Sequence, residues 1–277
     1  MNPKLKKKSG HAALFVLLLL VGITMLLPFI WTLSSSFKFN KDIFVYPIEW
    51  IPKEIRLQNY SDVWTKVPFL TYYLNTIKLS VIVTIGQILT CSMAAFSFAK
   101  MKYPGRDKIF LCYLATLMVP WHAIMIPQFI IIKGMGLYNS HAAIIVLQLF
   151  SAFGVFMMRQ FMMGIPDELC EAARIDGCGE WKIFSSIMMP LCKPGLATLV
   201  IFTFNFMWND YLAPMIYLDS DKLKTIQIGL ATFNSLYRTD YNLIMAGTVC
   251  SMIPMILIFC FAQKYLLQGM SFSGLKG

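Results

Sequence analysis

Long apolar runs alternate with short polar segments along this chain. A helix needs roughly 20 residues to cross a hydrocarbon core about 30 Å thick, and six of the runs reach that length. None of them alternates with the period of two expected of a membrane β-strand, and an open sheet would leave unpaired edges in lipid. The pattern predicts an all-α, polytopic membrane protein with six transmembrane helices, at 12–33, 79–99, 109–132, 142–163, 194–212 and 243–267.

The composition supports the membrane class. Of the 277 residues, 57% are hydrophobic and 14% are charged, and the mean hydropathy is +0.63. A soluble domain carries about 25% charged residues. The lysines at 4–8 resemble the start of a secretory signal, but the apolar run that follows is longer than a signal core and no A-x-A site comes after it. We therefore expect the first helix to be retained.

The positions of Lys and Arg predict the orientation. These residues are enriched in the cytoplasmic loops of membrane proteins, and most of the 24 here fall on one side if the N-terminus is cytoplasmic. The expected layout is a cytoplasmic N-terminus (1–11), a transmembrane domain (12–267) and a cytoplasmic C-terminal tail (268–277). The formal charge of +10 is then mainly a property of the inner face, and without an aromatic and basic groove it indicates no nucleic acid.

Motifs for catalysis or metal binding are scarce. The seven cysteines fall within the runs or on the inner side, so they imply no disulfide framework, and the three histidines have no metal-ligand spacing. Gly269 to Gly274 has the spacing of a phosphate-binding loop but lacks the G-K-[ST] ending and a preceding strand. We expect a chain that is not an enzyme and binds no cofactor, so that any energy from ATP comes from another protein.

The predicted outer loops are short, at 34–78, 133–141 and 213–242. None is long enough to form a sizeable core of its own. High-affinity capture of a solute outside the membrane is therefore expected to belong to another protein.

The predicted inner segment 164–193 differs from the other loops. Pro166-Asp167-Glu168 is typical of a helix start, and Gly177 suits a left-handed cap that ends this helix after roughly three turns. Trp181, Phe184, Ile187 and Met188 follow at spacings of three and four, which indicates a second, amphipathic helix. Amphipathicity alone would indicate only a helix lying at the membrane surface.

This segment resembles the EAA loop of permease subunits of ATP-binding-cassette importers. The matching residues are Glu171-Ala172-Ala173, then Gly177, then Ile187-Met188-Met189-Pro190, with Met189 where the family pattern has leucine. Three other stretches are similar to the carbohydrate-uptake branch and its maltose permease G-type subunits. They are Met125-Ile126-Pro127-Gln128 with Gly136-Leu137-Tyr138-Asn139, residues Trp208 to Pro214, and the end of the chain from Gln268 to Gly277.

The resemblance implies a type I importer permease fold in a bacterial plasma or inner membrane. It implies a heterodimer with a second permease subunit, two ATPase subunits that hold ATP-Mg, an extracytoplasmic sugar-binding protein and a sugar substrate, with an oligosaccharide favoured. By the same resemblance the EAA helix docks on the ATPase and couples it to the spans through Glu171, Ala172, Ala173, Asp176 and Gly177. The C-terminal tail is similar to a segment that contacts the ATPases.

A candidate substrate pathway lies along the fifth run. Asn205 and Asn209 are four residues apart on one helical face, beside Trp208 and Asp210. Weaker candidates of the same kind are Gln87, Gln128 and Gln148. Side-chain amides can hydrogen-bond to sugar hydroxyls, and an aromatic ring can stack on the face of a sugar as a flat plate. Alternatively, both amides serve only to bond neighbouring helices. The resemblance further assigns Tyr237, Arg238 and Asp240 to contact with the binding protein.

Three alternatives remain open. An ion-coupled secondary transporter usually has buried carboxylates or inverted repeats among its spans, and neither is evident. A polytopic membrane enzyme needs clustered His, Asp or Glu at one face, which this sequence lacks. An importer permease for a different solute class is opposed only by the similarities to the sugar branch.

Overall fold

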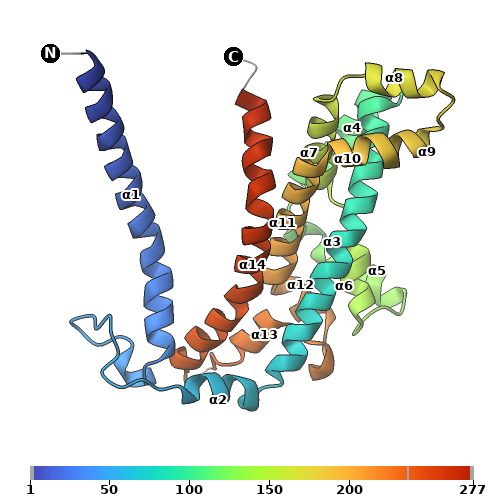
Figure 1. The fold of residues 1–277 in the computed structure, drawn as a ribbon. Coiled ribbons are helices and arrows are strands. Elements are labelled where there is room, and N and C mark those ends of the chain that lie inside the picture. The colour runs from blue at the N-terminus through green and yellow to red at the C-terminus, as the bar shows by residue number, and fades with distance from the viewer. Residues whose placement is uncertain (1–2, 236, 275–277) are drawn as a thin grey trace. The chain divides into compact units, whose positions relative to one another are not determined.

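The computed structural model describes residues 3–235 and 237–274, and these are helical almost throughout (Figure 1). An isolated bridge between Asn234 and Thr239 is the only β pairing among them, so the predicted all-α class is confirmed. The α-helices are α1 (Pro3–Ser36), α2 (Gln58–Lys66), α3 (Phe69–Lys100), α4 (Arg106–Ala115), α5 (Trp121–Gly134), α6 (His141–Gln148), α7 (Ala152–Met163), α8 (Glu168–Ile175), α9 (Glu180–Lys182), α10 (Met189–Leu191), α11 (Lys193–Asn209), α12 (Leu212–Tyr217), α13 (Ile226–Ala231) and α14 (Tyr241–Gly274). Short 3₁₀ turns lie at Asn40–Asp42, Thr116–Met118 and Asp221–Leu223, and a π-helical segment lies at Ile183–Met188.

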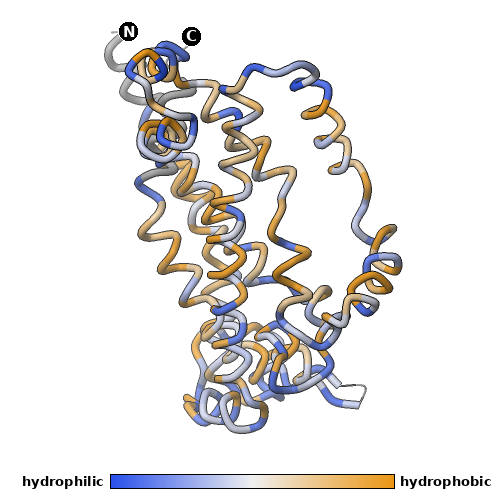
Figure 2. The backbone as a smooth tube through the Cα atoms, turned by 90° about the vertical axis from the view of Figure 1, so that its right-hand side faces the viewer, coloured by the Kyte–Doolittle hydropathy of each residue, from blue (hydrophilic) through white to orange (hydrophobic). Residues whose placement is uncertain are grey.

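Three helices in the described residues, α1, α3 and α14, are long and apolar enough to cross a membrane unaided. Three pairs of helical segments pass the same test together but are bent at a short break. The bend is 97° between Arg106–Met118 and α5, 41° between α6 and α7, and 80° between Glu180–Leu191 and α11. There are six spans if each bent pair counts as one. Hydrophobic colouring predominates along the long helical stretches of Figure 2.

Two of the predicted runs, 109–132 and 142–163, are each divided into two helices instead of forming the single helix that we expected. The run 109–132 breaks at Val119–Pro120, where Val119 is extended (φ −83°, ψ 112°). A residue before proline avoids the helical region, which explains the break. Pro28, Pro127 and Pro254 nevertheless lie inside helices, so a proline by itself does not predict where a span bends.

The second span begins at Phe69, ten residues before the predicted Leu79, and α2 also lies within the expected loop 34–78. Phe69, Tyr72, Thr76 and Leu79 are all buried, at the three- and four-residue spacing of one helix face. Tyr and Thr lower the mean hydropathy of this first part of the helix, which is why a hydropathy window does not detect it.

The chain divides into two compact units. The first comprises residues up to 67 and residues 230–252. At its centre, the fully buried Asn59 donates hydrogen bonds from its amide to the carbonyls of Ser36 (2.9 Å) and Lys38 (2.8 Å). Asn242 donates to the Asn59 side-chain oxygen at 2.7 Å. Since the last carbonyls of a helix have no partner within it, Asn59 stabilises the end of α1 and ties it to α2 and α14.

The second unit comprises residues 68–229 together with the chain from 253 onward, and α3 is its central helix, packed against α7 and α11. Gly154 of α7 lies at this junction. A Cβ there would be 2.9 Å from Cys91 Sγ of α3 and 3.1 Å from Leu199 Cδ1 of α11. The close approach of the three helices therefore requires a residue without a side chain.

The break between α6 and α7 is stabilised by polar side chains of α3. Gln87 Nε2 donates to the carbonyl of Gln148 (2.7 Å) and Thr90 Oγ1 donates to that of Leu149 (2.6 Å). Thr203 of α11 donates to Gln87 Oε1 at 2.8 Å. These bonds satisfy carbonyls that the bend frees, as an apolar environment demands. We call Gln87, Thr90 and Thr203 the polar clasp.

Candidate functional site

Helix α8 contains Glu171-Ala172-Ala173, the first residues of the segment that resembles the EAA loop. It runs for eight residues, about two turns rather than the three expected, with Glu168 and Glu171 in its first turn and Arg174 in its last. These charges suit the helix dipole. Cys170 and Ala173 are buried, whereas Ala172 is exposed. One face of α8 thus packs on the protein and another is open.

Gly177 ends this helix in the predicted left-handed conformation, with φ +79°. The N–H of Cys178 donates to the carbonyl of Ala173 (2.9 Å), and the N–H of Gly177 donates to that of Arg174 (3.0 Å). This pair of bonds is a Schellman cap. A Cβ on Gly177 would meet nothing within 4 Å, so glycine is required here by its backbone angle and not by space. Asp176, the last predicted coupling residue, is the exposed residue just before it.

A buried lysine joins α8 to the end of α3. The Lys100 side chain is 2% exposed, and its ammonium donates to the carbonyl of Ile165 (2.6 Å) and pairs with the Asp167 carboxylate. The hydrogen bond from Lys100 lowers the pKa of Asp167. Sequence reasoning missed this contact, because Lys100 was read only as a charge that sets the orientation. This contact joins the start of α8 to the end of α3.

A second ion pair closes the turn after α8. Arg174 pairs with Glu180, with 2.7 Å between Nε and Oε1, and lowers the pKa of Glu180 through that hydrogen bond. Arg174 also donates to the carbonyl of Lys100 at 3.4 Å. Glu171 has only a 3.5 Å pair with Lys102, in which both side chains are more than half exposed. The carboxylate of Glu171 is therefore available to a partner.

The segment after the turn buries one face and leaves an aromatic ring outside. Ile183, Phe184 and Met188 are buried, as the predicted amphipathic pattern requires for the last two, but Trp181 is 65% exposed. Leu169 and Ile175 of α8 are exposed as well, at 45% and 86%. The segment 168–181 therefore offers apolar side chains beside the open carboxylate of Glu171. An exposed apolar group of this kind is typical of a protein contact.

The two amides of the predicted pathway lie together at the end of α11. Asn209 Nδ2 donates to the backbone oxygen and to the side-chain oxygen of Asn205, at 2.9 Å each, and both residues are exposed. The expectation that Trp208 stands beside them as an aromatic plate is not met. Its ring is 1% exposed and packs against Tyr73 and Phe204, with centroids 5.5 and 5.6 Å away.

Asp210 and Gln128 make contacts within the protein. Asp210 Oδ1 accepts from the N–H of Ala213 (3.2 Å), as the residue at the start of a helix commonly does. Gln128 Oε1 accepts from Trp121 Nε1 (3.0 Å) and from the Tyr217 hydroxyl (3.3 Å). Both side chains position α5 and α12 in this conformation.

Hydrogen bonds join residues 233–235 to residues 237–240. The Arg238 and Asp240 side chains pair at 2.7 Å, and Thr239 Oγ1 donates to Asn234 Oδ1 at 2.7 Å. The N–H of Asp240 donates to the carbonyl of Phe233 at 2.9 Å. Tyr237, the first of residues 237–240, is 98% exposed.

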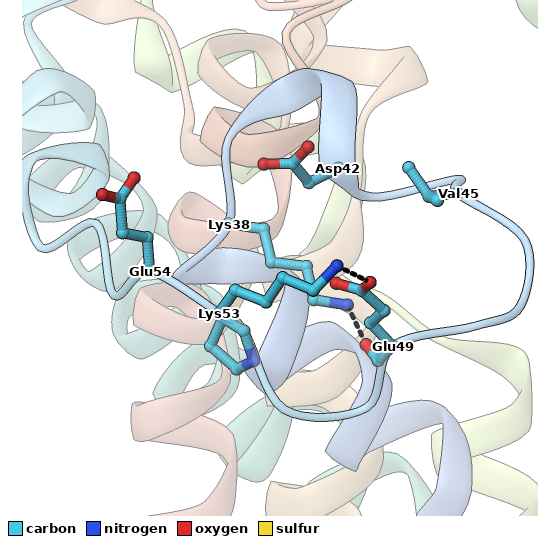
Figure 3. Close-up of a pocket in the computed structure, with 7 residues that line it drawn as sticks. Lys38, Asp42, Val45, Glu49, Lys53 and Glu54 are labelled. Atoms are coloured by element: carbon cyan, nitrogen blue, oxygen red, sulfur yellow. Dashed lines mark hydrogen bonds and ion pairs between the residues drawn. The ribbon is translucent and has the colours of Figure 1, made fainter.

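The segment 38–54 lines a partly open pocket of about 420 Å³ (Figure 3). Lys38 is 2% exposed and donates to the carbonyl of Glu49, whose carboxylate pairs with Lys53. Asp42 and Glu54 also line the pocket. Each lysine therefore has a partner inside the loop, and the described residues contain no cluster of three His, Cys, Asp or Glu placed to hold a metal ion.

Comparisons with known proteins agree with this architecture. The family described as binding-protein-dependent transport system inner membrane component matches residues 87–272. The arabinooligosaccharides transport system permease protein AraQ of Halalkalibacterium halodurans is 34% identical, with 82% of this chain and 81% of the relative covered. The lactose transport system permease protein LacG of Rhizobium radiobacter is 30% identical, with 98% of each covered.

A solved structure gives the same result. The crystal structure of a bacterial ABC transporter involved in the import of the acidic polysaccharide alginate aligns with a TM-score of 0.81 and 25% identity, covering 94% of this chain and 98% of the other. The fold and the sequence relationships thus extend over nearly the whole chain. This protein belongs to the family of inner-membrane components of binding-protein-dependent transport systems.

Proposed function

We propose that this chain is one of two permease subunits of an ATP-driven importer of an oligosaccharide, with both termini in the cytoplasm. It forms half of the translocation pathway and performs no catalysis itself. Two separate ATPase subunits hydrolyse ATP on the cytoplasmic side, and an extracytoplasmic binding protein delivers the sugar. The similar transporters are named for arabinooligosaccharides, lactose and alginate, which supports the substrate class.

The observation that carries the proposal is the construction of α8. A helix with an exposed carboxylate and exposed apolar residues is held by a buried lysine on the end of the membrane helix α3. An ATPase that binds the open face of α8 can therefore push or pull a span directly. Coupling requires this mechanical link between a docking surface and a two-state element.

Asn205 and Asn209 are the residues proposed to meet the sugar. Their mutual hydrogen bonds preorganise both side chains, and exposure leaves them accessible. Amides can both donate to and accept from hydroxyl groups. Trp208 supports these residues from inside the protein rather than touching the sugar.

Residues 237–240, which include the exposed Tyr237, are proposed to contact the binding protein from outside. An exposed Tyr held on a short, internally bonded segment supplies contact area at small entropic cost. The Arg238–Asp240 pair stabilises the shape of this segment.

The test is a mild-detergent pull-down of the tagged chain, with the co-purified proteins identified and quantified. Gly177→Val is the informative variant, because a non-glycine residue in the left-handed region costs about 1–2 kcal/mol and a β-branched one costs more. We expect a second permease and an ATPase to co-purify with the wild type, and the ATPase to be lost from this variant.

Gly179→Val is the matched control. Gly179 lies two residues away and has φ −70° and ψ 157°, and a Cβ at this position would meet nothing within 4 Å. It accepts valine without strain, so the ATPase should be retained. Retention by both variants would contradict the role of α8, and the absence of any ATPase from the wild type would contradict the importer itself.

A further inference from the structure

A shallow, open basic pocket lies at the turn between α3 and α4. It has a volume of about 590 Å³, and its cationic lining side chains are Lys102, Arg106 and Lys108. Lys102 and Lys108 are exposed, and Arg106 is fixed by a hydrogen bond to the carbonyl of Met101 at 3.2 Å. The pocket therefore presents three positive groups on a short stretch of defined backbone.

The two carboxylates that line this pocket already form ion pairs with cationic side chains. Asp107 accepts from Arg159 (3.0 Å) and also pairs with Arg106 (3.3 Å). Asp167 pairs with the buried Lys100. Lys100 therefore neutralises Asp167, and Arg159 neutralises Asp107. Glu171 offsets the charge of Lys102, but the charges of Arg106 and Lys108 remain, so the pocket carries an excess of positive charge.

The position of the pocket defines what can reach it. Residues 101–105 connect two membrane-crossing elements, so this turn lies where the hydrocarbon core meets water. Ile109 and Leu111, within the first two turns of α4, are 52% and 64% exposed. A ligand in the pocket would thus have its charged end among the cations and its apolar part beside α4.

We infer that this pocket binds the phosphate of an anionic phospholipid headgroup. The charge excess selects for the anion, and the adjoining apolar surface selects for a lipid rather than free phosphate. Basic side chains next to a membrane each contribute attraction to anionic lipid, and basic pockets at helix ends hold such headgroups. The site does not depend on which sugar the protein carries or on which side of the membrane the turn lies.

The pocket is connected to α8. Lys102 is the partner of Glu171 at 3.5 Å, and Asp167, which precedes α8, contributes to the lining. A phosphate that binds Lys102 competes with Glu171 for this ammonium. Anionic lipid would then free the Glu171 carboxylate for an ATPase.

The experiment measures lipid retention by native mass spectrometry. The full-length chain, with the proteins that co-purify with it, is reconstituted in nanodiscs of phosphatidylcholine with phosphatidylglycerol. Lys102→Gln/Lys108→Gln removes two exposed charges that hold no backbone group, so the fold should persist. We expect the retained phosphatidylglycerol to fall about fivefold for each lysine removed. Arg106→Gln, measured separately, should show a fall of similar size.

Lys193→Gln is the matched control, because Lys193 is an exposed lysine at the start of α11 that does not line the pocket. Wild-type retention in this control, with loss in the double variant, supports the site. Equal retention by wild type and double variant overturns it. A third arm adds inorganic phosphate. If phosphate displaces the lipid completely, the pocket is a site for free anions and the lipid assignment is wrong.

Discussion

At the scale of single residues, the Lys100–Asp167 contact should contribute more to stability than the Lys102–Glu171 contact, because Lys100 is buried, although the Asp167 carboxylate is itself 68% exposed. Asp167→Ala leaves a buried ammonium with the Ile165 carbonyl as its remaining partner, and we expect a loss of about 1–3 kcal/mol in the free energy of unfolding. Asp167 makes no side-chain cap bond to α8, so the loss of a cap does not contribute. The measurement is thermal unfolding of the purified protein in detergent.

Glu171→Ala serves as its control. That carboxylate is 54% exposed and lies 3.5 Å from a lysine that is 82% exposed, so the variant should unfold within about 0.5 kcal/mol of wild type. A larger loss from Glu171→Ala than from Asp167→Ala would contradict the assignment of Lys100 as the anchor of α8.

The same pair gives a pH dependence. Because Lys100 lowers the pKa of Asp167 in the folded protein, the contribution of Asp167 to stability is fully present above its unfolded pKa of about 3.9. It is lost as the pH falls through the lowered folded pKa. The difference in melting temperature between wild type and Asp167→Ala should stay constant from pH 8 to about pH 5 and shrink only in stronger acid. A difference in melting temperature that disappears near pH 6 would contradict the lowered pKa of Asp167 in the folded protein.

Substitutions at the neighbouring residues Trp208 and Asn209 should distinguish an effect on packing from an effect on transport. Trp208→Ala removes a buried ring, which typically costs about 3–5 kcal/mol, and should lower the amount of folded protein in the membrane. Asn209→Ala changes an exposed amide, so we expect normal amounts of protein with reduced sugar uptake in reconstituted vesicles. Normal uptake by Asn209→Ala would remove the amide pair from the proposed pathway.

At the scale of elements, the polar clasp should determine the stability of the α6–α7 bend. Gln87→Leu leaves the Gln148 carbonyl and the Thr203 hydroxyl without their partner, and we expect a loss of about 1–3 kcal/mol, measured as thermal unfolding in detergent. Thr84→Val is the control one turn earlier on α3. Its buried hydroxyl has no hydrogen-bond partner among the described residues, so that substitution should be neutral or slightly stabilising.

The polar clasp also illustrates why some elements can be predicted from the sequence and others cannot. Long apolar runs and the Gly177 cap depend on local chemistry, and both were predicted from the residues alone. The 41° bend at α6–α7 and the early start of α3 depend on side chains far away in the chain, such as Gln87 and the Tyr72 ring against Gly229. The burial of Trp208 and the anchoring role of Lys100 likewise needed the tertiary contacts. Local patterns carry no signal for such pairs.

At the scale of the whole molecule, the ion pairs constrain the topology. Lys100 at the end of α3 contacts Asp167 before α8, so residues 100 and 167 lie on the same side of the membrane. The chain between them contains the bent pairs α4–α5 and α6–α7. These pairs must together cross the membrane an even number of times. Either both cross, giving six spans in all, or both turn back within the membrane.

Single cysteines in a cysteine-free background distinguish the two cases. We expect Lys102→Cys and Ile175→Cys to react with a membrane-impermeant maleimide only after the cells are permeabilised, because both lie on the proposed cytoplasmic side. Lys133→Cys, in the exposed end of α5, and Tyr237→Cys should react in intact cells. If Lys133→Cys reacts only after permeabilisation while Tyr237→Cys reacts in intact cells, the 97° pair is a re-entrant element. The six-span topology would then be wrong, although α11 would still cross the membrane.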